Sequence, residues 1–194
     1  MPIIDNVKLE PTVPRMSGDP IEPLRPSIRR LLASPPSRRA ALRDELVKRI
    51  HDDAGATLEF ARVCATECGT EGHDLGVDLL AGAGTLAYRA ARVLLRQDGP
   101  AWANCPPTAQ RNEDEVWAVL LRGMARGHSS RSEALQLLEE CAGAPHRGLL
   151  VAVAEALGDL RNPEAAARLR EMAGAKTDPL VREVIANALD DMES

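Results

Sequence analysis

Apolar residues recur at helical spacing along most of the chain after Ser37. A helix from Arg38 to about Asp53 is predicted, with Ser37 as its N-cap and an apolar face of Ala41, Leu42, Leu46 and Ile50. Further helices are expected over residues 57–68, 73–97 and 108–126, separated by glycines and prolines. Gly82 and Gly84 are expected to bend or split the second of these. The pattern therefore predicts a chain of helices joined by short breaks.

The last third of the sequence contains an internal repeat. Residues 133–144 can be laid on residues 164–175 at a shift of 31. Residues 148–159 can be laid on residues 180–191 at a shift of 32. Two helices in a period of this length are typical of a helical solenoid, in which hairpins bury their apolar faces by stacking on one another.

Two of the predicted turns carry the same signal for the start of a helix. Asn162 precedes Pro163, and Asp178 precedes Pro179. Asn and Asp side chains accept hydrogen bonds from the unpaired N–H groups of a first helical turn, and proline fits there because it has no N–H. Since each turn is short, we expect the following helix to fold back antiparallel.

One stretch of the repeat resembles a known family. Residues 154–165 (Ala-Glu-Ala-Leu-Gly-Asp-Leu-Arg-Asn-Pro-Glu-Ala), followed by Asp178-Pro-Leu-Val-Arg182, resemble HEAT-like repeats of the phycobilisome-lyase type. The resemblance is best over residues 146–192 and fair from about residue 112. It implies a right-handed solenoid of helical hairpins, with second helices along a concave face and a usual role in protein binding. It also implies that Asp178 and Arg182 stabilise a turn together.

Helical geometry then predicts a surface for a partner. If Leu138, Cys141, Leu169 and Met172 face the core, their neighbours one or two positions away face outward. We expect the concave face to carry an exposed leucine beside a row of mixed charge: Gln136, Leu137, Glu140, Ala167, Arg168 and Glu171. The alternative is an ordinary solvated surface.

The first 36 residues are expected to form an extended proline-rich arm with one short helix near residues 27–33. Six prolines lie between residues 2 and 26, and each removes a backbone donor and disfavours helix before it. The arm is either a flexible tail or a strap that docks on its own helices or on another protein. In the second case its anchors are Ile3, Ile4, Val7, Val13, Ile21 and Leu24.

Composition narrows the class of fold to all-α. Aromatic residues make up 2% of the 194 residues and the hydrophobic class 44%. So few aromatic residues argue against a β-sandwich or barrel, and so many aliphatic ones argue against disorder. Four cysteines do not make a disulfide scaffold. Because no signal peptide or membrane-spanning stretch is recognisable, a bacterial cytoplasmic location is expected.

The charge of the chain is unevenly distributed. The net charge is −5, yet residues 1–50 carry +4 and the remainder −9. The arginines of the first segment could contact nucleic-acid phosphates, although Asp44 and Glu45 interrupt them. They are Arg25, Arg29, Arg30, Arg38, Arg39 and Arg43. Neither Trp102 nor Trp117 has a basic, aromatic neighbourhood, so nucleic-acid binding is the less favoured interpretation.

Cysteine and histidine positions raise the question of a metal site. Cys64 and Cys68 lie one helical turn apart, and with His73 and Cys105 they could form a soft metal site. No second cysteine pair is present, so we interpret the cysteines as small buried hydrophobic residues.

A second pattern invites comparison with metal-dependent phosphohydrolases that carry histidine–aspartate pairs on helices. The pairs here are His51-Asp52 and His73-Asp74. No later aspartate lies in a matching motif, because the repeat interpretation assigns Asp159, Asp178 and Asp191 to caps and turns. The sequence therefore predicts no catalytic residue, metal or cofactor.

These observations divide the chain into an arm (1–36), an N-terminal helical region (37–107) and HEAT-like repeats (108–194). The expected function is non-catalytic binding of another protein, as an adaptor, scaffold, assembly factor or regulator. One alternative is a helical enzyme or lyase-like protein that uses the concave groove. The other is nucleic-acid binding through residues 25–49.

Overall fold

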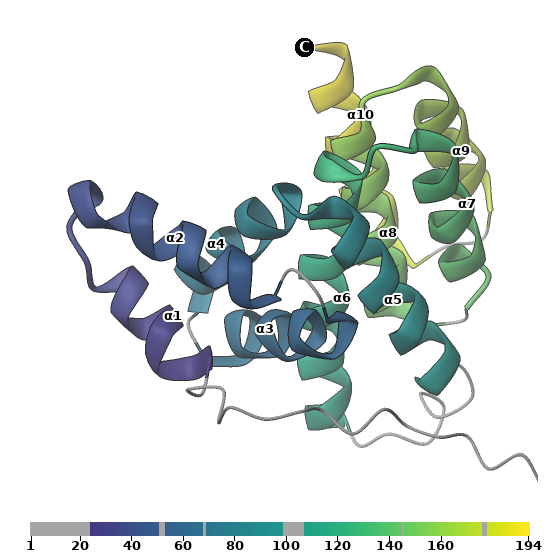
Figure 1. Ribbon diagram of the computed structural model, residues 1–194. Coiled ribbons are helices and arrows are strands. Elements are labelled where there is room, and N and C mark those ends of the chain that lie inside the picture. The colour runs from purple at the N-terminus through teal and green to yellow at the C-terminus, as the bar shows by residue number, and fades with distance from the viewer. Residues whose placement is uncertain (1–23, 51–52, 68, 99–106, 145, 176–177) are drawn as a thin grey trace, which may run out of the picture.

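The computed structural model describes residues 24–50, 53–67, 69–98, 107–144, 146–175 and 178–194. Within them the protein is all-α, with ten helices packed in hairpin-like pairs (Figure 1). The first five helices are α1 (Leu24–Leu32), α2 (Pro36–Ile50), α3 (Ala54–Glu67), α4 (Gly69–Ala81) and α5 (Gly84–Asp98). The others are α6 (Pro107–Gly127), α7 (Arg131–Ala142), α8 (Arg147–Leu160), α9 (Pro163–Gly174) and α10 (Pro179–Glu193). No helix in the described ranges has the length and apolar character needed to cross a membrane.

Three successive hairpins form the C-terminal part of the stack. They pair α5 with α6, α7 with α8, and α9 with α10. The second helices form one layer, in which α8 packs between α6 and α10. The first helices pack against this layer, α5 on α6, α7 on α8, and α9 on α8 and α10 (Figure 1).

Helix α6 is the centre of the molecule. It packs against α3, α4 and α5 on the N-terminal side and against α8 on the C-terminal side, while α1 and α2 pack on α3. Its Trp117 is buried, as is Phe60 of α3. One continuous hydrophobic core extends from α1 to α10, so the regions before and after residue 107 share a single interior.

Two of the helix starts predicted from the sequence are confirmed, whereas the N-cap predicted at Ser37 is wrong: α2 already begins at Pro36, which fits the first turn because it has no N–H. Asn162 Oδ1 accepts a hydrogen bond from the Ala165 N–H at 2.7 Å, and Asp178 Oδ1 accepts one from the Leu180 N–H at 2.9 Å. The long segment over residues 73–97 is split near Gly82 into α4 and α5. The break lets α5 turn back after α4 while both helices stay packed in the core.

The arm is described only from Leu24 onward. Leu24 begins α1 and is buried in the core with Ile28 and Leu31, so it belongs to the helical body. The short helix expected near residues 27–33 is α1. The other predicted anchors lie outside the described residues: Ile3, Ile4, Val7, Val13 and Ile21.

Candidate functional site

Helices α4 and α6 touch at one end and separate at the other. Near their C-terminal ends, a Cβ on Gly127 would overlap the carbonyl oxygen of Ala81, and a Cβ on Gly123 would lie 2.5 Å from Cβ of Leu80. Near their N-terminal ends only long side chains meet, with His73 Nε2 at 3.8 Å from Glu115 Oε2. The contact between α4 and α6 is therefore closest near their C-terminal ends, and a space lies beside their N-terminal halves, over α6.

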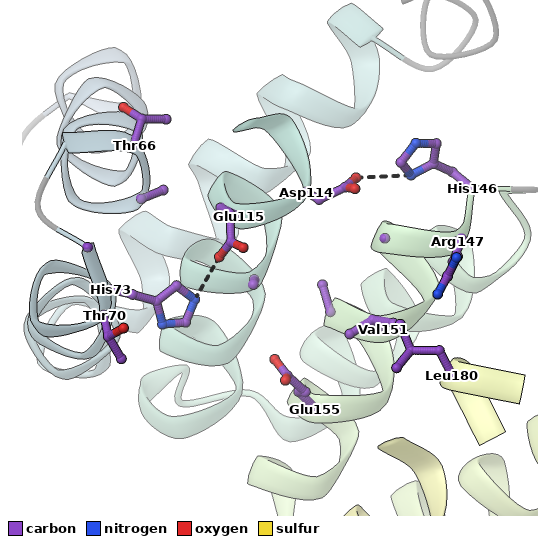
Figure 2. Close-up of a pocket in the computed structure, with 15 residues that line it drawn as sticks. Thr66, Thr70, His73, Asp114, Glu115, His146, Arg147, Val151, Glu155 and Leu180 are labelled. Atoms are coloured by element: carbon purple, nitrogen blue, oxygen red, sulfur yellow. Dashed lines mark ion pairs between the residues drawn. The ribbon is translucent and has the colours of Figure 1, made fainter. Parts of the chain in front are cut away.

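That space is a groove with a volume of about 910 Å³. Residues of α3 and α4 form one side, α6 lies between, and residues of α8 and α10 form the other side (Figure 2). Its main chemical groups are His73, Asp114, Glu115, Glu155 and the side chain of Leu180. The volume is near the upper end of the roughly 300–1,000 Å³ of small-molecule pockets, so it has room for several side chains of a partner.

Asp114 belongs to α6, and its carboxylate lies beside the cap at the N-terminus of α8. Its Oδ1 is 3.1 Å from Nδ1 of His146, and the same Nδ1 is 3.3 Å from the Leu149 N–H. One nitrogen cannot donate to the carboxylate and accept from the backbone at once, so these two contacts compete. Gly148 makes the approach possible, because a Cβ there would overlap the Asp114 carboxylate. Burial raises the pKa of Asp114, the nearby His146 opposes this rise, and Glu115 adds to it.

Glu155 lies one helical turn after Val151 on α8 and faces the groove (Figure 2). Burial is the largest cause of the raised pKa of Glu155. Arg122, whose Nη1 lies 3.9 Å from Glu155 Oε2, opposes that rise. Arg122 is held more closely by Asp159, whose Oδ2 accepts from Arg122 Nε at 2.8 Å. Asp159 Oδ1 also accepts from Arg126 Nε at 2.9 Å. The assignment of Asp159 to a cap or turn is therefore wrong: it links α8 to α6.

An exposed apolar side chain lies at the edge of the groove. Leu180, in the first turn of α10, is 40% exposed and is the large hydrophobic residue most open to solvent in the described structure. Figure 2 places it next to Val151 of α8. Carboxylates and an apolar contact point are thus found within one hollow.

The predicted concave-face residues do not line this groove. Leu137 is completely buried, so its predicted exposure is wrong. It packs in the core because the buried residues of α7 follow the i, i+3, i+4, i+7 spacing of one inward stripe: Ala134, Leu137, Leu138 and Cys141. The remaining five lie on α7 and α9, the first helices of their hairpins, whereas the groove is formed by α3, α4, α6, α8 and α10; they are Gln136, Glu140, Ala167, Arg168 and Glu171.

The residues expected to face inward on these two helices do so. Leu138, Cys141, Leu169 and Met172 are all buried. Burial raises the pKa of the Cys141 thiol to about 12, so the thiol stays protonated at neutral pH. The predicted site was therefore wrong in the choice of helices and, at Leu137, in the extent of the core-facing stripe.

One signal in the sequence could have pointed to Leu180. Val181, Ile185 and Ala188 follow helical spacing and are buried. Leu180 falls outside that stripe, immediately after Pro179. Asp114 and Glu155 carried no comparable signal, because acidic residues on helices are usually solvated.

The other sequence patterns gain little support as sites. Cys64 and Trp117 are both buried, whereas Cys68, Cys105 and Trp102 lie outside the described residues. His51 and Asp52 also lie outside. Among the described residues no cluster of three or more potential metal ligands is present.

Several arginines proposed to contact nucleic acid make contacts within the protein. Arg39 donates to the carbonyl oxygens of Ser34 and Leu32, at 2.8 and 3.1 Å. Arg43 lies 3.9 Å from Asp78. The guanidinium groups of α1 and α2 are therefore partly engaged in joining these helices to each other and to α4.

The stacked hairpins and the groove on the side of their second helices define a helical solenoid. Residues 108–190 match the family model for HEAT repeats. The narrower phycobilisome-lyase type stays a prediction. No curated protein and no solved structure matches the chain.

Proposed function

We propose that this protein is a non-catalytic binding module that holds a segment of another protein in the groove between α4 and α8. Solenoids of helical repeats typically bind partners along an extended concave surface. The observation that carries the proposal is the combination of a groove of about 910 Å³ with the exposed Leu180 at its edge. Covering an exposed leucine with a partner lowers the free energy of the complex in proportion to the apolar area removed from water.

Site-specific photo-crosslinking tests this proposal. A benzoylphenylalanine residue at Thr70, which is exposed and lines the groove, should capture a stoichiometric partner from a lysate of the source cells. The same group at Glu139, an exposed residue of α7, serves as the control and should capture none. Capture through Glu139 but not Thr70 would move the interface to the face formed by the first helices.

The variant Leu180→Glu connects the captured partner to the groove. We expect partner affinity to fall about tenfold or more, because a charge replaces an apolar contact. The melting temperature should hardly change, since the side chain is already 40% exposed. Ala186→Glu adds the same charge at an exposed position of α10 that does not line the groove, and it should leave affinity unchanged.

A helical enzyme that uses the same groove is the second candidate. The raised pKa of Asp114 and of Glu155, close to His146 and His73, favours it, because perturbed carboxyl groups in clefts often serve in acid–base catalysis. Native mass spectrometry separates the two candidates. A small molecule that co-purifies and is lost in Glu155→Gln supports the enzyme, whereas a bound protein supports the module.

A further inference from the structure

The groove carries more negative charge than its own positive groups balance. Three carboxyl groups line it, from Asp114, Glu115 and Glu155. Arg147 is the lysine or arginine that lines it within the described structure, and its Nε lies 3.4 Å from Oδ1 of Asp178. The two histidines carry charge only when protonated, so they are weak counter-charges. A ligand that brings positive charge would complete this balance.

Among the described residues, two of the three carboxylates have no donor within hydrogen-bond distance. Glu115 is 3.8 Å from His73 and Glu155 is 3.9 Å from Arg122, and both distances exceed hydrogen-bond length. Arg122 is already bonded to Asp159 at 2.8 Å, which limits what it can give to Glu155. Figure 2 shows both carboxylates extending into the space between α4 and α8. Their acceptor oxygens are therefore available to a ligand.

The apolar part of the groove adjoins the same carboxylates. Val151 precedes Glu155 by one helical turn, and Leu180 lies beside Val151 (Figure 2). A lysine or arginine side chain combines an aliphatic stem with a charged end, so it can cover apolar surface and reach an acid at once. The groove likewise places the apolar side chains of Val151 and Leu180 next to the carboxylate of Glu155.

We infer that the partner segment held in the groove is cationic, with a lysine or arginine head between Glu115 and Glu155 and an apolar side chain against Leu180. This inference rests on the proposed function, which it makes more specific. Electrostatic complementarity of this kind sets which partner binds and speeds its arrival, and it weakens as salt is added.

The protein's own N-terminal arm does not fit this description. Residues 1–23 contain two basic and four acidic residues, so their net charge has the same sign as the groove. The arginine-rich helices α1 and α2 of a second copy are a different occupant, and light scattering distinguishes them. Self-association that disappears in Glu155→Gln would identify the second copy and overturn the inference of a separate partner.

An unbiased peptide selection tests the chemistry of the occupant. A displayed library of random dodecapeptides is selected against the full chain, and the enriched sequences are synthesised with a fluorescent label. We expect lysine and arginine, with at least one aliphatic residue, to be enriched. Binding measured by fluorescence anisotropy should be about tenfold or more weaker in Glu115→Gln/Glu155→Gln.

Matched controls keep the result interpretable. Glu139→Gln/Glu183→Gln removes two exposed carboxylates outside the groove and should leave affinity unchanged. Folding is not at risk in the test variant, because glutamine removes a charge whose burial is unfavourable at Glu155.

The outcomes separate this inference from the proposed function. Neutral or acidic peptides that crosslink at Thr70 would overturn the cationic occupant and leave the groove as a binding site. Basic peptides that bind equally to both double variants would overturn it as well, since they bind elsewhere. If no selected peptide and no cellular protein crosslinks at Thr70, the proposed function fails with it.

Discussion

The two ends of the α4–α6 pair differ in what fills the space between the helices. At the C-terminal end, glycines of α6 let the two helices touch, and a Cβ on Gly127 would overlap the backbone of Ala81. At the N-terminal end, His73 and Glu115 reach across a gap with long side chains. The C-terminal ends of α4 and α6 thus form a close contact, while their N-terminal halves line a groove together with α3, α8 and α10.

The difference shows how a stack of helices produces a site. Helices held together at one end by residues without side chains must diverge elsewhere if their axes are not parallel. The groove lies over α6, between α4 and α8, away from this close contact. Its charged groups lie where separation leaves room for them, at the N-terminal halves of α4 and α6.

The largest expected effect comes from adding a side chain at the close contact between α4 and α6. Gly127→Ala should lower the free energy of unfolding by about 3 kcal/mol, because its Cβ would meet the backbone of Ala81, which cannot turn aside. For a chain of this size that is a fall of roughly 6–12 °C in melting temperature. Calorimetry or chemical denaturation measures it.

Gly174→Ala is the matched control for this change. A Cβ on Gly174, at the end of α9, has nothing within 4 Å. We expect no loss of stability there, and a gain of up to about 1 kcal/mol from reduced freedom of the unfolded chain. Equal losses at both positions would show that the close contact is not special.

The next effect concerns the link between α6 and α8 behind the groove. Asp159→Asn should cost about 1–2 kcal/mol, because Arg122 and Arg126 both lose a charged acceptor. Asp191→Asn occupies the corresponding position of the next repeat, where the side chain is exposed, and should cost less than 0.5 kcal/mol, approximately the usual limit for surface changes. Urea denaturation of the two variants checks the ranking.

A smaller effect is expected from Glu155 in the open groove. Its raised pKa means that the folded state holds this proton more tightly than the unfolded state, so stability is lost as pH rises between the unfolded and folded pKa. Glu155→Gln should therefore be more stable than the parent at pH 7, by less than about 1 kcal/mol because the side chain is 35% exposed. The gain should vanish below about pH 4, where the parent carboxyl is protonated as well.

Denaturation curves between about pH 4 and 7 measure this difference. Glu183→Gln on the exposed side of α10 is the baseline for a charge removed in solvent. A constant offset between the Glu155 variant and the parent at every pH would contradict the burial of this carboxyl.

The smallest effects are expected on the face formed by the first helices. Glu140 pairs with Arg92, and Glu171 pairs with Arg168 one turn earlier on α9. Because such exposed pairs contribute little, Glu140→Gln and Glu171→Gln should each change stability by less than about 0.5 kcal/mol. Partner binding should not change either, and a clear loss of affinity would return the interface to α7 and α9.

Local chemistry decided much of the fold. Asn162-Pro163 and Asp178-Pro179 specify helix starts through contacts within a few residues, so they could be interpreted directly. The repeat across the last third and the near absence of aromatic residues fixed the all-α hairpin architecture for the same reason. These features depend on neighbours along the chain, which a sequence shows.

Only the tertiary structure decided which face holds the site. Periodicity places Leu138 inward, and the spacing from Ala134 places Leu137 inward too, but it could not show that α7 lies away from the groove. It could not show that Asp114 approaches α8 through the space left by Gly148, or that Asp159 joins two repeats. These contacts join residues more than thirty positions apart, and the angles at which whole helices pack determine them.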